Sequence, residues 1–390
     1  MRTRSENHSR IRAAAAAASV ALMGAMLPAE AFAAEPGALH SAEEMEHLAD
    51  NNLEWYEIDG LISEYNATVV KNRNEFNKDE RRTYDAQEVT DYLLSEADSL
   101  ESRADSFADT AAVLSATYRN QANSLRMQAE SNVTDHEVIL LQYQLIEKQT
   151  AAAARTAFLN YYAGLYEKEF ADANVAYLER LYQSAATRKN VGIGTEVELL
   201  TAQENLDNAR AGRLSTESAI VSSRNSALVM CGWAYDSAGV IGPLPEMTVE
   251  EALAVSYEAD LAAAQERNLT LKIDRIKLRN AQTGNYTTLI LEQNQNQLNQ
   301  DTNSFGINFK AAYDKLVNAA AAYTNAANDK AVADLNLATA ERQLSLGTIS
   351  ALDHAKALNA SQASALALRK AYIDMIAARS AYDDAVNGNI

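Results

Sequence analysis

The distribution of proline constrains this 390-residue chain more than any other feature. The four prolines lie at Pro28, Pro36, Pro243 and Pro245. More than two hundred residues between the second and third contain none. Proline removes a backbone donor and clashes with the preceding helical turn, so its absence permits long uninterrupted helices. Abundant alanine with only 14 glycines is also typical of long helices and coiled coils. Residues 232–247 hold two prolines, Gly239 and Gly242, and we interpret them as a linker between two halves.

The N-terminus has the pattern of an export signal. Four arginines precede an apolar run from Ala13 to Leu27, and Ala31-Phe32-Ala33 follows as a small-x-small cleavage pattern. We therefore predict a signal peptide over residues 1–33. The apolar run is shorter than the roughly 20 residues that span a membrane, and no later segment approaches that length. The mature protein is expected to be exported to the cell envelope without a membrane-spanning helix.

Charge and cysteine content exclude several classes of partner and bond. The chain has 34 basic and 53 acidic residues, a net charge of -19. Loss of residues 1–33 removes four Arg and two Glu and leaves -21. Such acidity argues against nucleic acid as a partner. The single cysteine, Cys231, allows no internal disulfide and lies far from the cleavage site, so we expect a plain buried residue.

Two similar helix starts follow the two proline-containing stretches. Ser41 with Glu44, and Thr248 with Glu251, both have the spacing of a capping box. In a capping box the hydroxyl accepts from a free backbone N–H, and the acid three residues later accepts from the N-cap amide. Recurrence of the box on both sides of one linker indicates an internal repeat.

A second pair of matching motifs predicts two tight helix-to-helix turns. The first is Gly192-Ile-Gly194-Thr195-Glu-Val197-Glu198, and the second is Gly347-Thr-Ile-Ser350-Ala-Leu352-Asp353. Each glycine suits the left-handed residue that ends one helix, and the hydroxyl with its acid caps the next. The distance from helix start to turn is 154 residues in the first half and 102 in the second. The two copies therefore differ by a 52-residue insertion or deletion.

The extra length of the first copy carries a heptad. Its members alternate steps of three and four: Leu93, Ala97, Leu100, Ala104, Phe107, Ala111, Leu114 and Tyr118, with Ala122, Leu125 and Ala129 after one extra residue. This period predicts a coiled-coil extension at about residues 93–129 with an irregularity near Tyr118. A 50-residue arm would reach about 75 Å at 1.5 Å per residue.

The predicted fold class is all-α, with long antiparallel helical hairpins or coiled coil in two tandem repeats. The first repeat covers residues 34–231, including the coiled-coil extension. The linker covers 232–247, and the second repeat covers 248–390.

The turn motifs resemble the hairpin tips of TolC-like outer-membrane efflux proteins. The resemblance extends over Gly192 to Leu206 and Leu346 to Asp353, and Pro245 to Ala254 is similar to the usual repeat opening of that family. It implies a homotrimer whose helices form a tunnel and whose tips meet an adaptor, or membrane fusion, protein of an inner transporter. The exported cargo would be small molecules or peptides. The implied tip residues are Gly192, Gly194, Thr195, Glu198, Leu200, Gly347, Ser350, Leu352 and Asp353. Those residue types are equally explained by helix termination and capping alone.

The chain departs from the family where membrane strands are expected. Strands of about 9 to 11 alternating residues are not evident, so we predict little or no β-barrel. The heptad occupies the place of the strands in the first repeat, and the polar run of residues 292–301 occupies it in the second. We interpret Thr302 to Phe309 as the far turn of the second hairpin. The location implied by the family is the outer membrane and periplasm; without strands, the wall of a single-membrane bacterium is the alternative.

No residue set supports catalysis, a metal or a cofactor. The four histidines of the mature chain, at positions 40, 47, 136 and 354, include no pair at i, i+4 and lie far from the cysteine. We expect them on solvated helix surface. No phosphate loop, nucleophile motif or isolated pair of carboxylates is present, so an enzyme is not expected.

Two functional hypotheses remain. The first is a TolC-like efflux component that forms a helical export conduit and docks an adaptor. The alternative is an exported coiled-coil scaffolding protein of the envelope without channel activity.

Overall fold

The computed structural model describes residues 45–390 except 46, 79–82, 109–111 and 285. These residues belong to one unit, Ala38–Ile390. The predicted signal peptide and the predicted Ser41 capping box lie outside the described residues. The described chain is almost entirely helical and contains two strands of two residues each, which confirms the all-α prediction.

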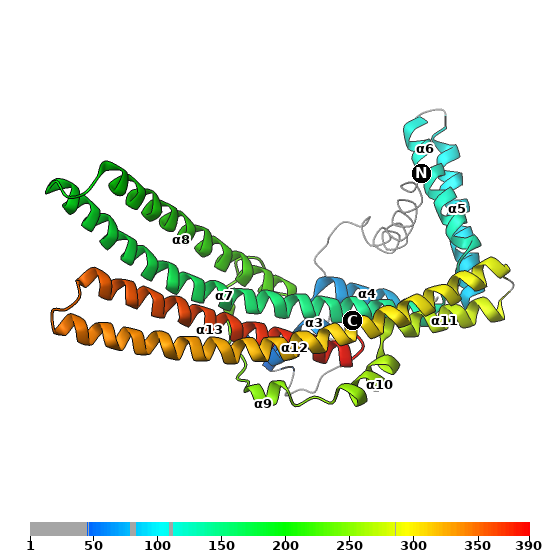
Figure 1. The fold of residues 1–390 in the computed structure, drawn as a ribbon. Helices are drawn as coiled ribbons and strands as arrows, with labels where there is room; N and C mark the ends of the chain where they lie inside the picture. The colour runs from blue at the N-terminus through cyan, green and yellow to red at the C-terminus, as the bar shows by residue number, and fades with distance from the viewer. Residues whose placement is uncertain (1–44, 46, 79–82, 109–111, 285) are drawn as a thin grey trace, which may run out of the picture. The chain divides into compact units, whose positions relative to one another are not determined.

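The elements follow one another as short helices, an arm, a first long hairpin, the shorter helices α9 to α11 and a second long hairpin (Figure 1). Their bounds in chain order are β1 Asn52–Leu53, η1 Trp55–Glu57, α3 Ile58–Tyr65, α4 Ala67–Lys78, α5 Ala86–Ser106, α6 Ala112–Glu130, α7 His136–Asn190, α8 Glu196–Met230, β2 Val240–Ile241, α9 Val249–Ala252, α10 Tyr257–Arg267, α11 Leu269–Thr283, α12 Thr288–Ser345 and α13 Ala351–Val386.

The two long hairpins are α7 with α8 and α12 with α13. The helices α7 and α12 run for 55 and 58 residues without a break. Both lie in proline-free sequence, so every turn keeps its backbone hydrogen bond. Each pair packs in antiparallel fashion along its length. The absence of proline therefore predicts the longest elements of the fold.

Two apolar clusters hold the hairpins to the shorter elements. The first joins α3, α7, α8 and the end of α13, with Ile58, Phe158 and Ile376 at its centre. Cys231 lies in this cluster as a free buried thiol, and burial raises its pKa to about 12, which confirms the predicted core role. The second cluster contains residues from each of the helices α9, α10, α11, α12 and α13, and it includes Phe309 and Tyr382. The parallel pairing of β1 with β2 ties the first helices to the segment between the hairpins.

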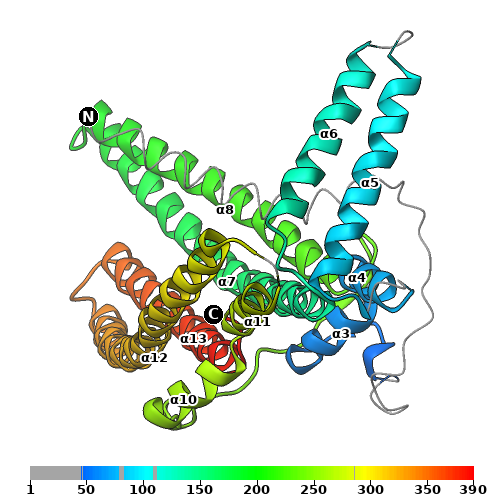
Figure 2. The same ribbon diagram turned by 90° about the vertical axis from the view of Figure 1, so that its right-hand side faces the viewer.

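The predicted coiled-coil extension is present, but it is a hairpin of two helices and not one 50-residue arm. The structure ends α5 at Ser106 and begins α6 at Ala112, and the two helices pack against each other in antiparallel fashion (Figure 2). The expectation of one long arm is therefore wrong, because a seven-residue spacing can continue across a chain reversal. The seam itself is made of heptad positions, with Ala97, Ala104 and Ala122 almost fully buried. Small residues there let the two backbones approach closely.

The interpretation of residues 302–309 as a turn is also wrong. These residues lie inside α12, and the reversal instead falls between α11 and α12, where Thr287 caps α12. Phe305 and Phe309 are one helical turn apart and both enter the second cluster, with ring centroids 5.8 Å apart. Burial of two aromatic rings on one helical face outweighs the weak strand preference of this short segment.

The two hairpins contact each other through α7 and α13. Three polar pairs define the register: Asn359 Nδ2 donates to Asn174 Oδ1 at 3.4 Å, Arg369 pairs with Glu169, and Arg155 pairs with Asp384 at 2.6 Å. Residue numbers rise along α7 while they fall along α13, so the contact is antiparallel. Since α7 leads to its tip and α13 leads away from its own, both tips lie at the same end of this contact (Figure 1).

Candidate functional site

The first hairpin tip is closed by a hydrogen-bonded turn at the end of α7. Gly192 N donates to Lys189 O and Ile193 N donates to Arg188 O, both at 3.0 Å. Gly192 has φ of 79°, the left-handed region that glycine adopts without a steric penalty. This is a Schellman arrangement, in which the last carbonyls of the helix find donors just beyond its end.

The second tip repeats this arrangement at the end of α12. Gly347 N donates to Leu344 O at 3.0 Å and Thr348 N donates to Gln343 O at 2.9 Å. Gly347 has φ of 68°. The predicted match between the two glycines is confirmed at the level of individual hydrogen bonds.

Gly194 has a different structural role from Gly192. A Cβ at Gly194 would lie 2.8 Å from Lys189 N and 3.0 Å from Arg188 C, so the chain passes too close to α7 for a side chain. The equivalent position of the second tip is Ile349. The two tips therefore share their hydrogen bonds but differ in how closely the following residues approach the preceding helix.

Both tips start their second helix with the predicted capping box. Glu198 N donates to Thr195 Oγ1 at 3.2 Å, and Thr195 N donates back to Glu198 Oε2 at 3.2 Å. Ser350 and Asp353 make the same pair of bonds, each at 3.1 Å. Hydrogen bonds from the Ser350 hydroxyl and amide hold the pKa of the Asp353 carboxyl below its usual value. The Thr248 box is present as well.

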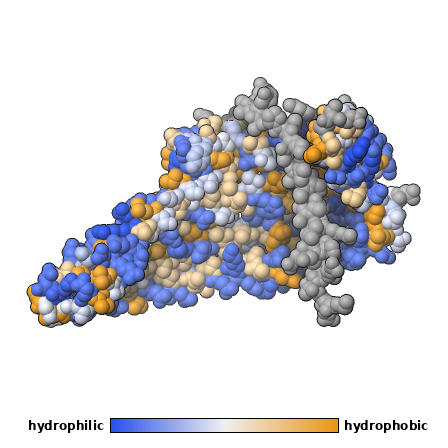
Figure 3. Space-filling view, turned by 90° about the horizontal axis from the view of Figure 1, so that it is seen from above, coloured by the Kyte–Doolittle hydropathy of each residue, from blue (hydrophilic) through white to orange (hydrophobic). Residues whose placement is uncertain are grey.

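The tips expose apolar side chains that no capping argument explains. Ile193, Val197 and Leu346 are each 71% exposed. Leu200 is exposed one turn along α8, whereas Leu352 is half-buried. Ile193 and Leu346 are not among the predicted tip residues, which are mostly glycines and capping residues, although an aliphatic residue beside a turn glycine is visible in the sequence. Figure 3 shows hydrophobic patches among hydrophilic surface at its tapering left-hand end.

Ion pairs bracket the apolar residues of the first tip. Arg188 lies 3.7 Å from Glu198, and Lys189 contacts Glu196. The basic residues lie in the last turn of α7 and the acidic residues in the first turn of α8, so each charge also faces the favourable end of its helix dipole. The first tip is thus an apolar surface with a charged rim.

A buried arginine joins three elements away from the tips. Arg155 of α7 is 11% exposed and donates to Asp59 of α3 and Asp384 of α13, both at 2.6 Å. Burial raises the pKa of Asp384, and the guanidinium of Arg155 opposes that rise. This contact holds the α7 and α13 helices together.

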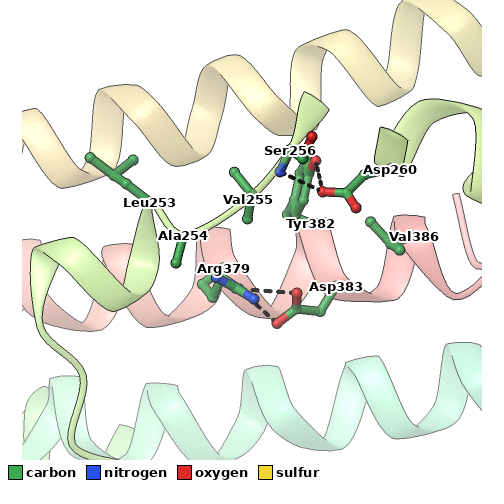
Figure 4. A pocket seen from close by; sticks show the side chains of 9 residues that line it. All are labelled: Leu253, Ala254, Val255, Ser256, Asp260, Arg379, Tyr382, Asp383 and Val386. Atoms are coloured by element: carbon green, nitrogen blue, oxygen red, sulfur yellow. Dashed lines mark hydrogen bonds and ion pairs between the residues drawn. The ribbon is translucent and has the colours of Figure 1, made fainter. Parts of the chain in front are cut away.

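A cleft of about 570 Å³ lies between α13 and the segment that connects α9 with α10 (Figure 4). Its charged side chains and its tyrosine hydroxyl have partners. Tyr382 OH donates to Asp260 Oδ2 at 2.9 Å, and Arg379 Nε donates to both carboxylate oxygens of Asp383. Arg379 also donates to the carbonyl of Glu251 at 2.9 Å. The bonds from Tyr382 to Asp260 of α10 and from Arg379 to Glu251 of α9 hold the two ends of the connecting segment on α13.

Neither a metal site nor a membrane-spanning helix is found in the part of the chain that the structure describes. No three His, Cys, Asp or Glu side chains gather there in a group that would hold an ion. None of the helices formed by those residues is long and apolar enough to cross a membrane. His136 departs from the expected solvated position, since its Nδ1 lies 2.9 Å from Tyr84 O at the base of the α5–α6 arm.

Comparison with known proteins finds similarity of structure. No protein-family model and no curated protein sequence matches the chain. Among solved structures, the CmeC outer membrane channel of Campylobacter jejuni is similar with a TM-score of 0.50 and 10% identity, over 93% of this chain and 91% of CmeC.

The chain has the TolC-like fold.

Other outer membrane channels also align with it. The outer-membrane channel OprN aligns with a TM-score of 0.48 and 11% identity, over 93% of this chain and 99% of OprN. CusC aligns with a TM-score of 0.47 and 12% identity, over 86% of this chain and 96% of CusC. Within the TolC-like fold, the candidate site of this chain is the pair of tips.

Proposed function

We propose that this protein is an exported envelope component that forms a homotrimeric helical conduit for efflux and docks an adaptor protein through its two tips. Similarity of fold to an outer membrane channel supports the conduit. Passage through the conduit would require no bond-making chemistry from this chain. An inner transporter would be a further partner, and small molecules or peptides would be the cargo.

The observation that carries this proposal is the exposed apolar residues on the two flanking helices. Helix α8 packs on α7, α7 on α13, and α13 on α12, so α8 and α12 are the outer members of the row. Leu214 and Val221 of α8 are seven residues apart and exposed, and Val332 and Leu335 of α12, three residues apart, are exposed as well. Exposed apolar residues aligned on two long helices are typical of surfaces that pack against another chain.

The positions of these two flanks favour a closed ring of copies. One flank is on α8 and the other on α12, so α8 of one copy would meet α12 of the next. Such a head-to-tail contact generates a ring when its rotation closes. The number of three copies rests on the resemblance to TolC-like proteins. A ring of this kind would present all tips at one end, because the two tips of each copy lie at the same end of its α7–α13 contact.

The tips have the chemistry of a protein-docking surface. Their exposed aliphatic residues suit contact with apolar side chains of an adaptor, and the ion pairs of the first tip would lie at the rim. We propose Gly192, Gly194, Thr195, Glu198, Leu200, Gly347, Ser350, Leu352 and Asp353 as the residues that shape this surface.

The oligomeric state tests the conduit directly. Light scattering on the purified chain should give three times the monomer mass. Leu214→Glu with Val221→Glu, or Leu335→Glu alone, should give monomers of unchanged helix content, because a charge cannot be buried in an apolar contact without a partner. Val113→Glu on the α5–α6 arm, where the side chain is also exposed, is the matched control and should remain trimeric. A stable monomer of the unaltered chain would refute the conduit.

Transport is tested in cells that lack this chain. They should accumulate exported dyes or peptides several-fold more than cells that have it. The unaltered chain should restore export and Leu335→Glu should fail. Equal accumulation with and without the chain, across a broad panel of compounds, would count against efflux.

Adaptor docking is tested at the tip glycines. Gly192→Val with Gly347→Val forces branched side chains into left-handed backbone, so the turns must rearrange while the helices persist. Binding of the proposed adaptor protein should be lost. Gly212→Val is the control, since Gly212 also has open space around its Cα but lies within α8. Unchanged binding by the double variant would refute docking at the tips.

A further inference from the structure

Two carboxyl groups meet inside the contact between α11 and α12, where a seam residue would normally be apolar. Asp274 stands between Leu271 and Leu278 at steps of three and four, and Asp301 stands in the same way between Leu298 and Phe305. Leu271, Leu298 and Phe305 belong to the second apolar cluster. The sequence therefore places an acid at a seam position on each of two adjacent helices (Figure 1).

Asp274 is deeply buried, and one of its two carboxylate oxygens lacks a hydrogen-bond partner in the described part of the chain. Its residue is 7% exposed, and its Oδ2 has no hydrogen-bond partner among the residues that the structure describes. The facing carboxyl of Asp301 is in hydrogen-bond contact with it. Asp301 Oδ2 accepts a bond from Gln297 Nε2 at 2.8 Å. Two carboxylates are both acceptors, so their contact is satisfied only when one of them carries a proton.

The charged groups around this pair do not neutralise it. Lys277, on the same helix, lowers the pKa of Asp274, but by less than burial and Asp301 raise it. Towards α10, Arg275 lies 3.7 Å from Glu266. Towards α7, Arg279 lies 3.5 Å from Asp135 and 3.1 Å from Glu137. The nearby arginines are thus already paired with other acids.

We propose that the contact between Asp274 and Asp301 is a pH-sensitive clasp, closed by one shared proton in acid and loosened when both carboxyls are ionised. One proton is taken up when the clasp closes and released when it opens. No other co-reactant is needed.

The direction of the pH effect follows from the raised pKa. Burial, followed by the contact with Asp301, raises the pKa of Asp274 to about 7. The carboxyl of an unfolded aspartate has a pKa of about 3.9. A group whose pKa is raised by folding contributes its full stabilisation below the unfolded value and loses it as the pH rises through the folded value. The clasp is therefore tight below pH 4 and weakens progressively up to about pH 7 and beyond.

The clasp has a structural consequence because α11 bridges the two hairpins. Helix α11 packs on α12 of the second hairpin and on α7 of the first, where Ile273 and Ile276 contact Val138. Loosening of α11 from α12 would free the end of each hairpin that is remote from its tip. If the chain forms the proposed conduit, the packing at the end remote from the tips would therefore change with pH. That consequence alone rests on the proposed function.

Hydrogen exchange of the α11 amides in the full chain tests the clasp. After correction for the intrinsic pH dependence of exchange, the opening of α11 should increase about tenfold between pH 6 and pH 8 in the presence of a chelator. Asp274→Asn should abolish this increase, because its amide donates to Asp301 at every pH. Asp301→Asn, on α12, should also abolish the increase. It is the variant to measure if Asp274→Asn does not fold.

Asp329→Asn is the matched control, since Asp329 is an exposed aspartate on α12. It should keep the tenfold increase. A flat profile for the unaltered chain, or a full tenfold increase in both Asn variants, would overturn the proposal. The readout concerns the chain alone, so failure of the clasp and failure of the conduit are distinguishable.

Discussion

At the scale of single residues, helix ends are specified by local hydrogen bonds. Gly192 and Gly347 end two helices through the same pair of backbone bonds, and Thr195 and Ser350 start the next two through capping boxes. These features were predictable because each involves residues within a few positions of one another. Arg155 was not predictable, because its partners Asp59 and Asp384 are 96 and 229 residues away.

Arg155→Met should lower the free energy of unfolding by about 3 kcal/mol at pH 7. This value is at the lower end of the range for breaking a buried ion pair, because the side chain of Asp59 is well exposed. The loss should shrink at pH 5. Without the guanidinium the pKa of Asp384 rises further, so the destabilisation is greatest above that pKa and disappears as the carboxyl is protonated. Urea unfolding followed by circular dichroism at both pH values measures this. Adding Asp384→Asn should recover part of the stability at pH 7; an equal loss at pH 5 and pH 7 would contradict this account.

At the scale of elements, periodicity identifies a seam but not the path of the chain through it. The heptad from Leu93 to Ala129 predicts a coiled-coil extension, and α5 and α6 supply its seam from two helices that run in opposite directions. Phe107 and Tyr118 stack with ring centroids 6.0 Å apart near the reversal. Arg126 with Asp98 at 2.8 Å, and Arg119 with Asp105 at 2.9 Å, fix the antiparallel register.

Ala97→Leu should melt this arm without unfolding the rest of the chain. Ala97 is fully buried in the seam, and extra methylenes there cost about 1 to 3 kcal/mol. The effect should stay local because α5 and α6 pack mainly against each other. Hydrogen exchange should show lost protection in α5 and α6 and unchanged protection in α7 and α8. Ala116→Leu, at an exposed position of α6, should leave the arm intact. Loss of protection throughout the chain would show that the arm is coupled to the hairpins.

At the scale of the whole molecule, charge and apolar surface oppose each other. Residues 34–390 carry a net charge of -21, which makes copies repel one another. The exposed aliphatic residues of α8 and α12 would favour association. An assembly of these chains depends on which effect is larger under the conditions of measurement.

Raising the salt concentration from about 20 mM to about 500 mM should strengthen the proposed trimer, because the Debye length falls several-fold and repulsion is screened while apolar contact persists. Sedimentation or light scattering over a dilution series should show dissociation at lower protein concentration in high salt than in low salt. The opposite trend would mean that ion pairs, and not the apolar flanks, hold the copies together.

The helical class, the positions of the two tips and the residues that cap them can all be predicted from the amino-acid sequence. Scarce proline, turn glycines and capping boxes act over a few residues, so their effects do not depend on the rest of the chain. Three features follow from packing between distant residues: α5 and α6 fold back on each other, residues 302–309 lie inside α12, and Asp274 meets Asp301. Those outcomes depend on which apolar faces bury one another. A periodic pattern shows that a face exists, but its partner is chosen by packing between residues that are distant in sequence.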